Sequence, residues 1–187
     1  HNQAMGTETL KSNTTGSCNV GIGTEALRTN SSGGNNIAIG HLAMYANNTT
    51  GSNIAIGSCA LYSNTANANT VVGAGAMLTN TSGYYNTAIG YQTLQDNDSG
   101  SNNTAIGHCA LHENENHHNT GVGMYALLCN TSGAGNTAVG ICGLCKNTSG
   151  DNGVAVGRDA AANNTIGDCN VATGYQSLYN NVTGGCL

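Results

Sequence analysis

Cysteine and histidine are the residues of this sequence best able to form covalent bonds or to hold a metal ion. The chain has eight cysteines, and Cys142 and Cys145 form a C-x-x-C pair, which is half of a common zinc-binding pattern. No second pair follows at zinc spacing. We therefore do not interpret this pair as a zinc site.

A second group of metal-ligand side chains crowds the stretch 108–118. Imidazole, thiol and carboxylate groups together can bind a transition metal. The stretch lacks the Thr-Ser-Gly or Thr-Thr-Gly turn that several other repeats carry, so we interpret it as a variable outer loop and expect no metal and no cofactor. The side chains concerned are His108, Cys109, His112, Glu113, Glu115, His117 and His118.

Arrangements typical of catalysis are missing from the sequence. We find no nucleophile–base pair, no recurring carboxylate dyad and no phosphate-binding loop. Glu8 and Lys11 recur one repeat later as Glu25 and Arg28, which we interpret as surface charge pairs rather than as acid–base catalysts. We expect no enzyme and no catalytic residue.

One phrase organises the whole chain, and any site must be positioned by it. Asn86-Thr87-Ala88-Ile89-Gly90 returns eleven times at intervals of 16 or 17 residues. Ala or another small residue follows three positions after the glycine, and Leu or Met follows at the fourth. The central glycines are Gly6, Gly23, Gly40, Gly57, Gly73, Gly90, Gly107, Gly123, Gly140, Gly157 and Gly174.

An asparagine stands seven residues after every central glycine, and we name these residues the turn-Asn column. Asn tolerates left-handed backbone and bonds neighbouring backbone in turns, and stacked Asn side chains bond one another. Members such as Asn13, Asn80 and Asn130 lie in N-x-S/T sequons, but the column persists where the sequon is lost, as at Asn64, so we predict a structural ladder rather than glycosylation. The column is Asn13, Asn30, Asn47, Asn64, Asn80, Asn97, Asn114, Asn130, Asn147, Asn164 and Asn181.

The repeat predicts an all-β, parallel β-solenoid of about eleven coils, forming one domain over residues 1–187. Each unit reads as a short strand, a turn, a second short strand and a turn. A unit of this size cannot bury its apolar face alone, and stacking the units buries it. Eleven coils at roughly 4.8 Å each give a rod about 50 Å long. All charged residues fall in variable positions, which we therefore place outside.

Alternation within the phrase predicts two strand faces, and neither carries charge. Thr87 and Ile89 face one way, and Asn86, Ala88 and Gly90 face the other. We expect one face to pack inside the coil. We expect the Ala and Gly face to meet another sheet or another chain, and we therefore expect an oligomer, a trimer in particular.

The predicted coils make the cysteine pairs testable. Cys169 and Cys186 lie twelve residues after successive central glycines, so they should be neighbours on adjacent coils. Cys129 and Cys145 form a second candidate pair on adjacent coils. Two disulfides and free thiols both remain open.

Tyrosines supply a candidate binding patch. Tyr45 and Tyr62 should stack on adjacent coils, with Tyr84, Tyr85 and Tyr91 close by. Exposed tyrosine can stack on a sugar ring or contact a protein partner. A host glycan or receptor is therefore a candidate partner, and ordinary filling of an outer groove is the alternative.

Composition excludes some partners. The net charge is −5 and Lys and Arg together number four, which argues against nucleic acid and anionic membrane surfaces. No run of apolar residues is long enough to span a membrane, so we expect no membrane insertion. Because His1 opens the chain in mid-repeat, we interpret it as a piece of a longer or processed fibre.

The repeat resembles the head units of trimeric autotransporter adhesins, which contain S-V-A-I-G. It looks still more like the N-T-A-I-G-Y-x-A-L arrays of fibre proteins from phages and large viruses, and Asn86 to Gly100 is the most similar single copy. The adhesin unit is shorter and seldom carries cysteine. The resemblance implies a trimeric, left-handed β-roll in a fibre or adhesin shaft on a cell or virion surface.

Two rival functions remain open. One is an extracellular filament whose subunits stack end to end. The other is an ice-binding solenoid, because Thr70, Thr87, Thr104, Thr120 and Thr137 form a column. A flat ice-binding face requires a second exposed column beside the first, and the neighbouring positions are Asn and Ala.

Overall fold

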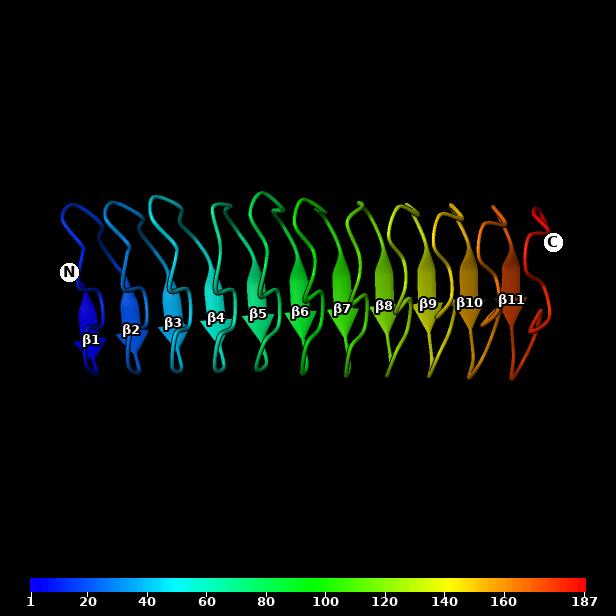
Figure 1. Ribbon diagram of the computed structural model, residues 1–187, viewed down its shortest axis with the longest axis horizontal. Helices are drawn as coiled ribbons and strands as arrows, with labels where there is room; N and C mark the ends of the chain where they lie inside the picture. The colour runs from blue at the N-terminus through cyan, green and yellow to red at the C-terminus, as the bar shows by residue number, and fades with distance from the viewer.

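A computed structural model describes all residues, 1–187, and it is a parallel β-solenoid. Figure 1 shows eleven three-residue strands side by side along a rod, with the chain ends at opposite ends of the rod. No helix is present that is long and apolar enough to cross a membrane. The strands are β1 Gln3–Met5, β2 Val20–Ile22, β3 Ile37–Ile39, β4 Ile54–Ile56, β5 Thr70–Val72, β6 Thr87–Ile89, β7 Thr104–Ile106, β8 Thr120–Val122, β9 Thr137–Val139, β10 Val154–Val156 and β11 Val171–Thr173.

All strands form one sheet in sequence order, and every neighbouring pair is parallel and in register. Thr87 pairs with Thr104, Ala88 with Ala105, and Ile89 with Ile106. The predicted fold class is therefore confirmed. Register is fixed because a slip of one residue would exchange the two faces of the strand.

The prediction of a second strand in each coil is wrong. The segment that follows the central glycine, which we call the leg, has left-handed backbone at two positions. In the coil of Gly90 these are Gln92 with φ 52° and Leu94 with φ 49°. Backbone hydrogen bonds still run from coil to coil along this leg, including Leu94 N–H to the Ala110 carbonyl at 3.1 Å. The leg is therefore paired like a sheet without having strand geometry.

The central glycine makes the turn between the two legs. Gly90 has φ 137°, a conformation that L-residues rarely adopt, and a Cβ there would lie 2.5 Å from the carbonyl oxygen of Gly107. The same close approach repeats in neighbouring coils, for example from Gly40 to Gly57. Only glycine fits this column.

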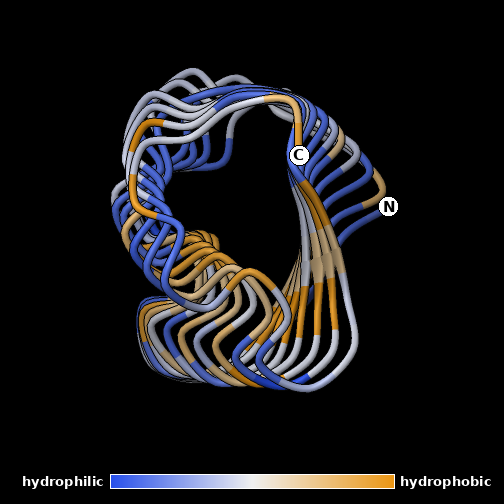
Figure 2. Ribbon diagram, turned by 90° about the vertical axis from the view of Figure 1, so that its right-hand side faces the viewer, coloured by the Kyte–Doolittle hydropathy of each residue, from blue (hydrophilic) through white to orange (hydrophobic).

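The core has an apolar half and a polar half. Viewed along the rod axis, Figure 2 shows hydrophobic backbone gathered at one end of the cross-section and hydrophilic backbone at the other. The apolar half stacks strand alanines such as Ala88 against leucines such as Leu94, both 0% exposed. The polar half is filled by buried asparagines, and no charged residue is buried anywhere in the chain.

The predicted assignment of the two strand faces is also wrong. The Ala face points inward, with Ala38, Ala88 and Ala105 fully buried, whereas the β-branched side points to solvent. Volume explains the orientation, because the leucines of the opposite leg already occupy much of the interior and leave room for small side chains, of which Val71 is the largest. A single chain therefore covers one face of its sheet and leaves the other open.

Candidate functional site

The open sheet face runs along all eleven strands. We name it the outer sheet face and define it by the first and third residues of β1 to β11, which include Thr87 and Ile89. Exposure of the second of its columns is nearly constant, with Ile56 at 37%, Ile89 at 40% and Ile106 at 38%. No residue of either column is charged. The face is a flat, uncharged strip of methyl and hydroxyl groups.

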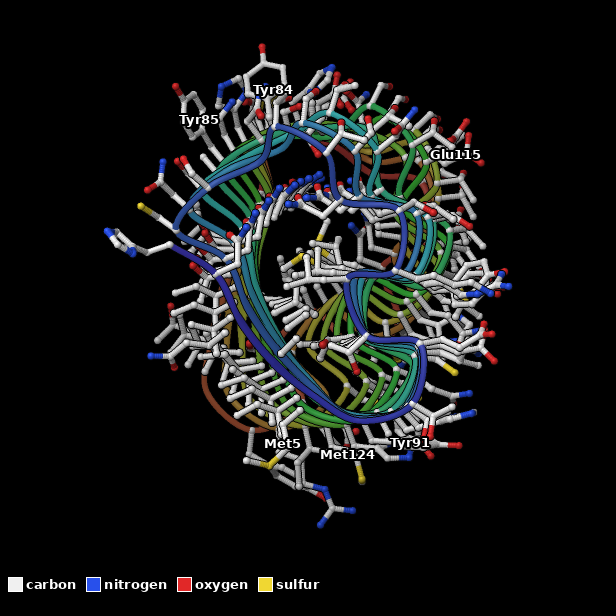
Figure 3. The ribbon with its side chains drawn as sticks, turned by 90° about the vertical axis from the view of Figure 1, so that its left-hand side faces the viewer. Met5, Tyr84, Tyr85, Tyr91, Glu115 and Met124 are labelled. Atoms are coloured by element: carbon white, nitrogen blue, oxygen red, sulfur yellow. The ribbon has the colours of Figure 1, made fainter.

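Apolar side chains extend this strip past the central glycines. Tyr91, Met124 and Ile141 stand one residue after their glycines and are 51%, 41% and 42% exposed. Figure 3 shows Tyr91 and Met124 at the same end of the cross-section as Met5 of β1. Tyr91 stacks on His108 of the next coil, with 5.5 Å between ring centroids.

The turn-Asn column forms a continuous hydrogen-bonded ladder inside the polar half. Asn97 Nδ2 donates to Asn80 Oδ1 at 3.0 Å and to the Gly100 carbonyl at 2.9 Å. Asn114 Nδ2 donates in turn to Asn97 Oδ1 at 3.1 Å. Among the sequon asparagines on this ladder, Asn30, Asn80 and Asn130 are 0% exposed, so these three are closed to sugar attachment in the folded chain.

A second asparagine ladder precedes the strands, and the sequence analysis assigned it no role. Asn86 N–H donates to Asn69 Oδ1 at 2.9 Å, and Asn86 Nδ2 donates to the Gly100 carbonyl at 2.8 Å. Both ladders therefore meet on the same carbonyl. The signal was available in the sequence, because Asn stands four residues before ten of the eleven central glycines.

The predicted tyrosine patch divides into three separate places. Tyr45 and Tyr62 stack as expected, with ring centroids 5.1 Å apart, and Arg28 donates to the Tyr45 hydroxyl at 2.7 Å. Figure 3 places Tyr84 and Tyr85 at the opposite end of the cross-section from Tyr91. The division arises because the rings stand at different distances from their central glycines and so leave the coil in different directions.

Only one of these places is hollowed. Tyr84 and Tyr85 border a hollow of about 350 Å³, which we name the tyrosine notch. Its lining residues are Thr65, Ala66, Asn67, Ser82, Tyr84 and Tyr85. The two rings meet edge to face, with centroids 5.2 Å apart, and they are 48% and 62% exposed.

All eight cysteines are free thiols, which is the second of the two alternatives for the candidate pairs. Adjacent coils do carry both pairs, and Cys129 N–H donates to the Cys145 carbonyl at 3.1 Å. The Cys145 thiol instead approaches the Ala162 carbonyl at 3.7 Å. Burial, followed by hydrogen bonding with Cys142, raises the pKa of Cys145 to about 12. This thiol is therefore a poor nucleophile near neutral pH.

The remaining polar groups do not assemble a reactive site. No group of three or more His, Cys, Asp or Glu side chains is placed to hold a metal ion. In the 108–118 stretch Cys109 is buried, whereas Glu113, His117 and His118 are exposed. Glu8 lies 2.7 Å from Lys11 Nζ and 2.6 Å from Arg28 Nε. The hydrogen bonds from Lys11 and Arg28 lower the pKa of Glu8.

Comparisons with protein families, with curated proteins and with solved structures find no match to this chain.

Proposed function

We propose that this protein is the shaft of a surface fibre or adhesin, in which three copies pack through their outer sheet faces. The observation that carries the proposal is the uncovered face itself. It runs the length of an eleven-strand sheet, carries no charge and repeats Ile or Val at almost every coil. Apolar strips of this regularity on a soluble surface mark interaction sites.

The dimensions of the face suit a second copy of the same chain. A rod of about 50 Å and three-residue strands of about 10 Å give about 500 Å², and the exposed side chains after the central glycines, such as Tyr91 and Met124, extend this toward the roughly 800 Å² that each partner buries in a standard interface. Two such faces from parallel rods also match in period, because each coil adds the same rise. A threefold arrangement is what the resemblance to adhesin heads implies.

Mass in solution tests the shaft. We expect multi-angle light scattering to give three times the 18.8 kDa of one chain. The double variant Ile89→Glu and Ile106→Glu should give single chains, because it places charge at the centre of the interface. The matched control, Ser99→Glu and Ser132→Glu, adds the same charge at exposed positions away from the face and should remain trimeric.

A mass other than that of three chains contradicts the packed shaft, and the form of the particles tests the end-to-end filament. Single chains of the unaltered protein at high concentration would overturn the packed shaft. Negative-stain images of long threads instead of short particles would favour the end-to-end filament.

Ice binding is a second candidate, and one observation favours it. The neighbours of the threonine column on the exposed side are not Asn and Ala but Ile and Val, because Ala points inward. Thr87 and Ile89, repeated as Thr104 and Ile106, make a flat two-dimensional grid of hydroxyl and methyl groups. Such a grid can order a sheet of water.

A thermal-hysteresis measurement tests this candidate on the same face. Ice binding predicts a gap between melting and freezing that disappears in Thr104→Tyr, since a bulky ring breaks the flat grid. The control Thr131→Tyr changes an exposed threonine elsewhere on the coil and should keep the gap. Absence of a gap in the unaltered protein would exclude ice binding.

A further inference from the structure

The tyrosine notch arises from a coil that is one residue short. The interval from Gly57 to Gly73 is 16 residues, and its turn reads Thr-Ala where the next coil has Thr-Ser-Gly. Ala66 replaces the turn glycine as the residue whose carbonyl joins the two ladders. This carbonyl accepts from Asn64 Nδ2 at 2.7 Å and from Asn53 Nδ2 at 2.9 Å. The ladders continue without a break, and the missing residue leaves an empty place on the outside.

The next coil walls this empty place with aromatic rings. Tyr84 and Tyr85 follow its Thr-Ser-Gly turn, and Tyr85 is held in left-handed backbone with φ 56°. Tyr84 N–H donates to Ser101 Oγ at 3.1 Å, which fixes the base of the first ring. Neither phenol hydroxyl has a partner in the chain, so both rings present an uncovered face and an unused polar end.

Polar groups at the floor are also unused. Asn67 Oδ1 accepts from Gly51 N–H at 2.8 Å, and this bond orients the side chain while leaving its Nδ2 without a partner. Ser82 Oγ makes no hydrogen bond within the chain. None of the six lining residues is charged. The notch therefore offers aromatic surface and neutral donors and acceptors, side by side.

We infer that the tyrosine notch binds one pyranose ring of a glycan. The C–H face of a pyranose packs on an aromatic ring, and its hydroxyl groups both donate and accept hydrogen bonds. Asn67 Nδ2, Ser82 Oγ and the tyrosine hydroxyls supply partners for them. A volume of about 350 Å³ suits a single sugar ring and its first linkage. The inference goes beyond the shaft and does not depend on it.

A second short coil provides an internal comparison. The interval from Gly107 to Gly123 is also 16 residues, and its ladder is likewise continued by Asn116, whose carbonyl accepts from Asn114 Nδ2 at 2.7 Å. The coil that follows has Ala134 and Gly135 where the first has Tyr84 and Tyr85, and no hollow forms there. A short turn without the tyrosine pair is therefore not sufficient to form the hollow.

Saturation-transfer NMR on the unaltered protein tests the inference, with methyl glycosides of glucose, galactose, mannose and N-acetylglucosamine as probes. We expect transfer to the ring protons of at least one probe, at millimolar affinity. Tyr84→Ala and Tyr85→Ala should each weaken that affinity at least tenfold. Tyr175→Ala removes a tyrosine that is 67% exposed on another part of the coil, and it should leave the affinity unchanged.

A fourth variant separates the notch from mere exposure of tyrosine. Inserting one serine between Thr65 and Ala66 restores a 17-residue coil and fills the empty place while both rings remain. We expect this variant to lose binding. Transfer that survives the insertion, or transfer to none of the four glycosides, overturns the inference. Scattering on the same samples reports the oligomer independently, so failure of the shaft and failure of the notch are distinguishable.

Discussion

At the scale of single residues, the solenoid depends on side chains that satisfy the same need in every coil. Glycine makes the close turn, and an asparagine such as Asn97 donates to one backbone carbonyl and to its neighbour in the ladder. Because the same residues recur in every coil, the effect of a substitution in a middle coil can be compared with the effect of the same substitution in an end coil.

Gly90→Ala should destabilise the protein strongly. Its Cβ would lie 2.5 Å from the Gly107 carbonyl oxygen, and its φ of 137° is strained for alanine. Gly174→Ala is the matched control, because φ is 115° but no atom lies within 4 Å. We expect about 1–3 kcal/mol from strain in both variants and a further loss from the clash in Gly90→Ala alone. Equal shifts in urea midpoint would show that backbone approach does not constrain the column.

Asn97→Ala should cost more than Asn13→Ala. Asn97 is fully buried, and its loss leaves Asn80 Oδ1 without a donor and one hydrogen of Asn114 Nδ2 without an acceptor, whereas the Gly100 carbonyl keeps its bond from Asn86. Each unsatisfied buried group costs about 1–3 kcal/mol. Asn13 is a half-buried end rung that receives from Asn30 and donates to Gly16. Urea titrations of the two variants measure the difference, and equal losses would contradict a cooperative ladder.

Cys145 should resist alkylation. Burial and Cys142 raise its pKa from an ordinary 9.0 to about 12, so little thiolate exists at pH 8. We expect iodoacetamide to modify exposed Cys18 at least tenfold faster, as measured by peptide mass spectrometry. Because the folded pKa is the higher one, the stability from this thiol is full below about pH 9 and is lost as pH rises toward 12. Equal alkylation rates would contradict its burial.

At the scale of the element, each coil is one short strand joined to a leg of left-handed turns. Thirty-one non-glycine residues have positive φ, far above the few per cent usual in proteins. Coil-to-coil hydrogen bonds hold them there, since each one alone costs about 1–2 kcal/mol. The leg is thus strained locally and stabilised only by its neighbours.

Two glutamines of one coil test this strain. Gln92 has φ 52°, whereas Gln95 has an ordinary backbone, and both are half-buried. Gln95→Gly should destabilise by about 0.5–1 kcal/mol through added freedom of the unfolded chain. Gln92→Gly should be neutral or stabilising, because relief of the left-handed strain offsets that cost. The comparison needs thermal unfolding of both variants, and a larger loss for Gln92→Gly would contradict it.

The residues that form columns along the rod could be predicted from the sequence, but the directions in which their side chains point could not. The spacing of glycines such as Gly90 and of asparagines such as Asn97 sets the coil and its ladder. The left-handed leg was missed because Leu94 has the character of a strand residue and only its coil neighbours impose its conformation. The inward face was misassigned because Ala88 and Ile89 are both uncharged, and interior volume alone decides between them.

The tyrosine notch shows a different limit of sequence reasoning. The 16-residue interval from Gly57 to Gly73 can be read from the sequence. Whether it leaves a hollow depends on which outer side chains stand in the next coil. Tyr91 is near Tyr84 and Tyr85 in sequence but lies at the opposite end of the cross-section from them. Proximity along the chain is therefore a poor guide to a surface patch in a solenoid.

At the scale of the whole molecule, the rod is a stack in which each strand contacts only the strands before and after it. No contact between distant coils fixes the total length. Stability should then be close to a sum over coils and their interfaces, and the number of coils should be adjustable without loss of fold.

Removal of one coil tests this additivity. Deleting residues 87–103 joins Asn86 to Thr104 and keeps both asparagine ladders and the outer sheet face in phase. We expect a folded rod with an unchanged circular-dichroism shape and a urea m-value lower by about one eleventh, since m follows the surface exposed on unfolding. Deleting residues 91–98 instead removes Leu94 and Asn97 and leaves a coil too short for either ladder, so it should unfold at much lower urea. If the two deletions were equally damaging, the length of the rod would be fixed by the molecule as a whole rather than by successive coils.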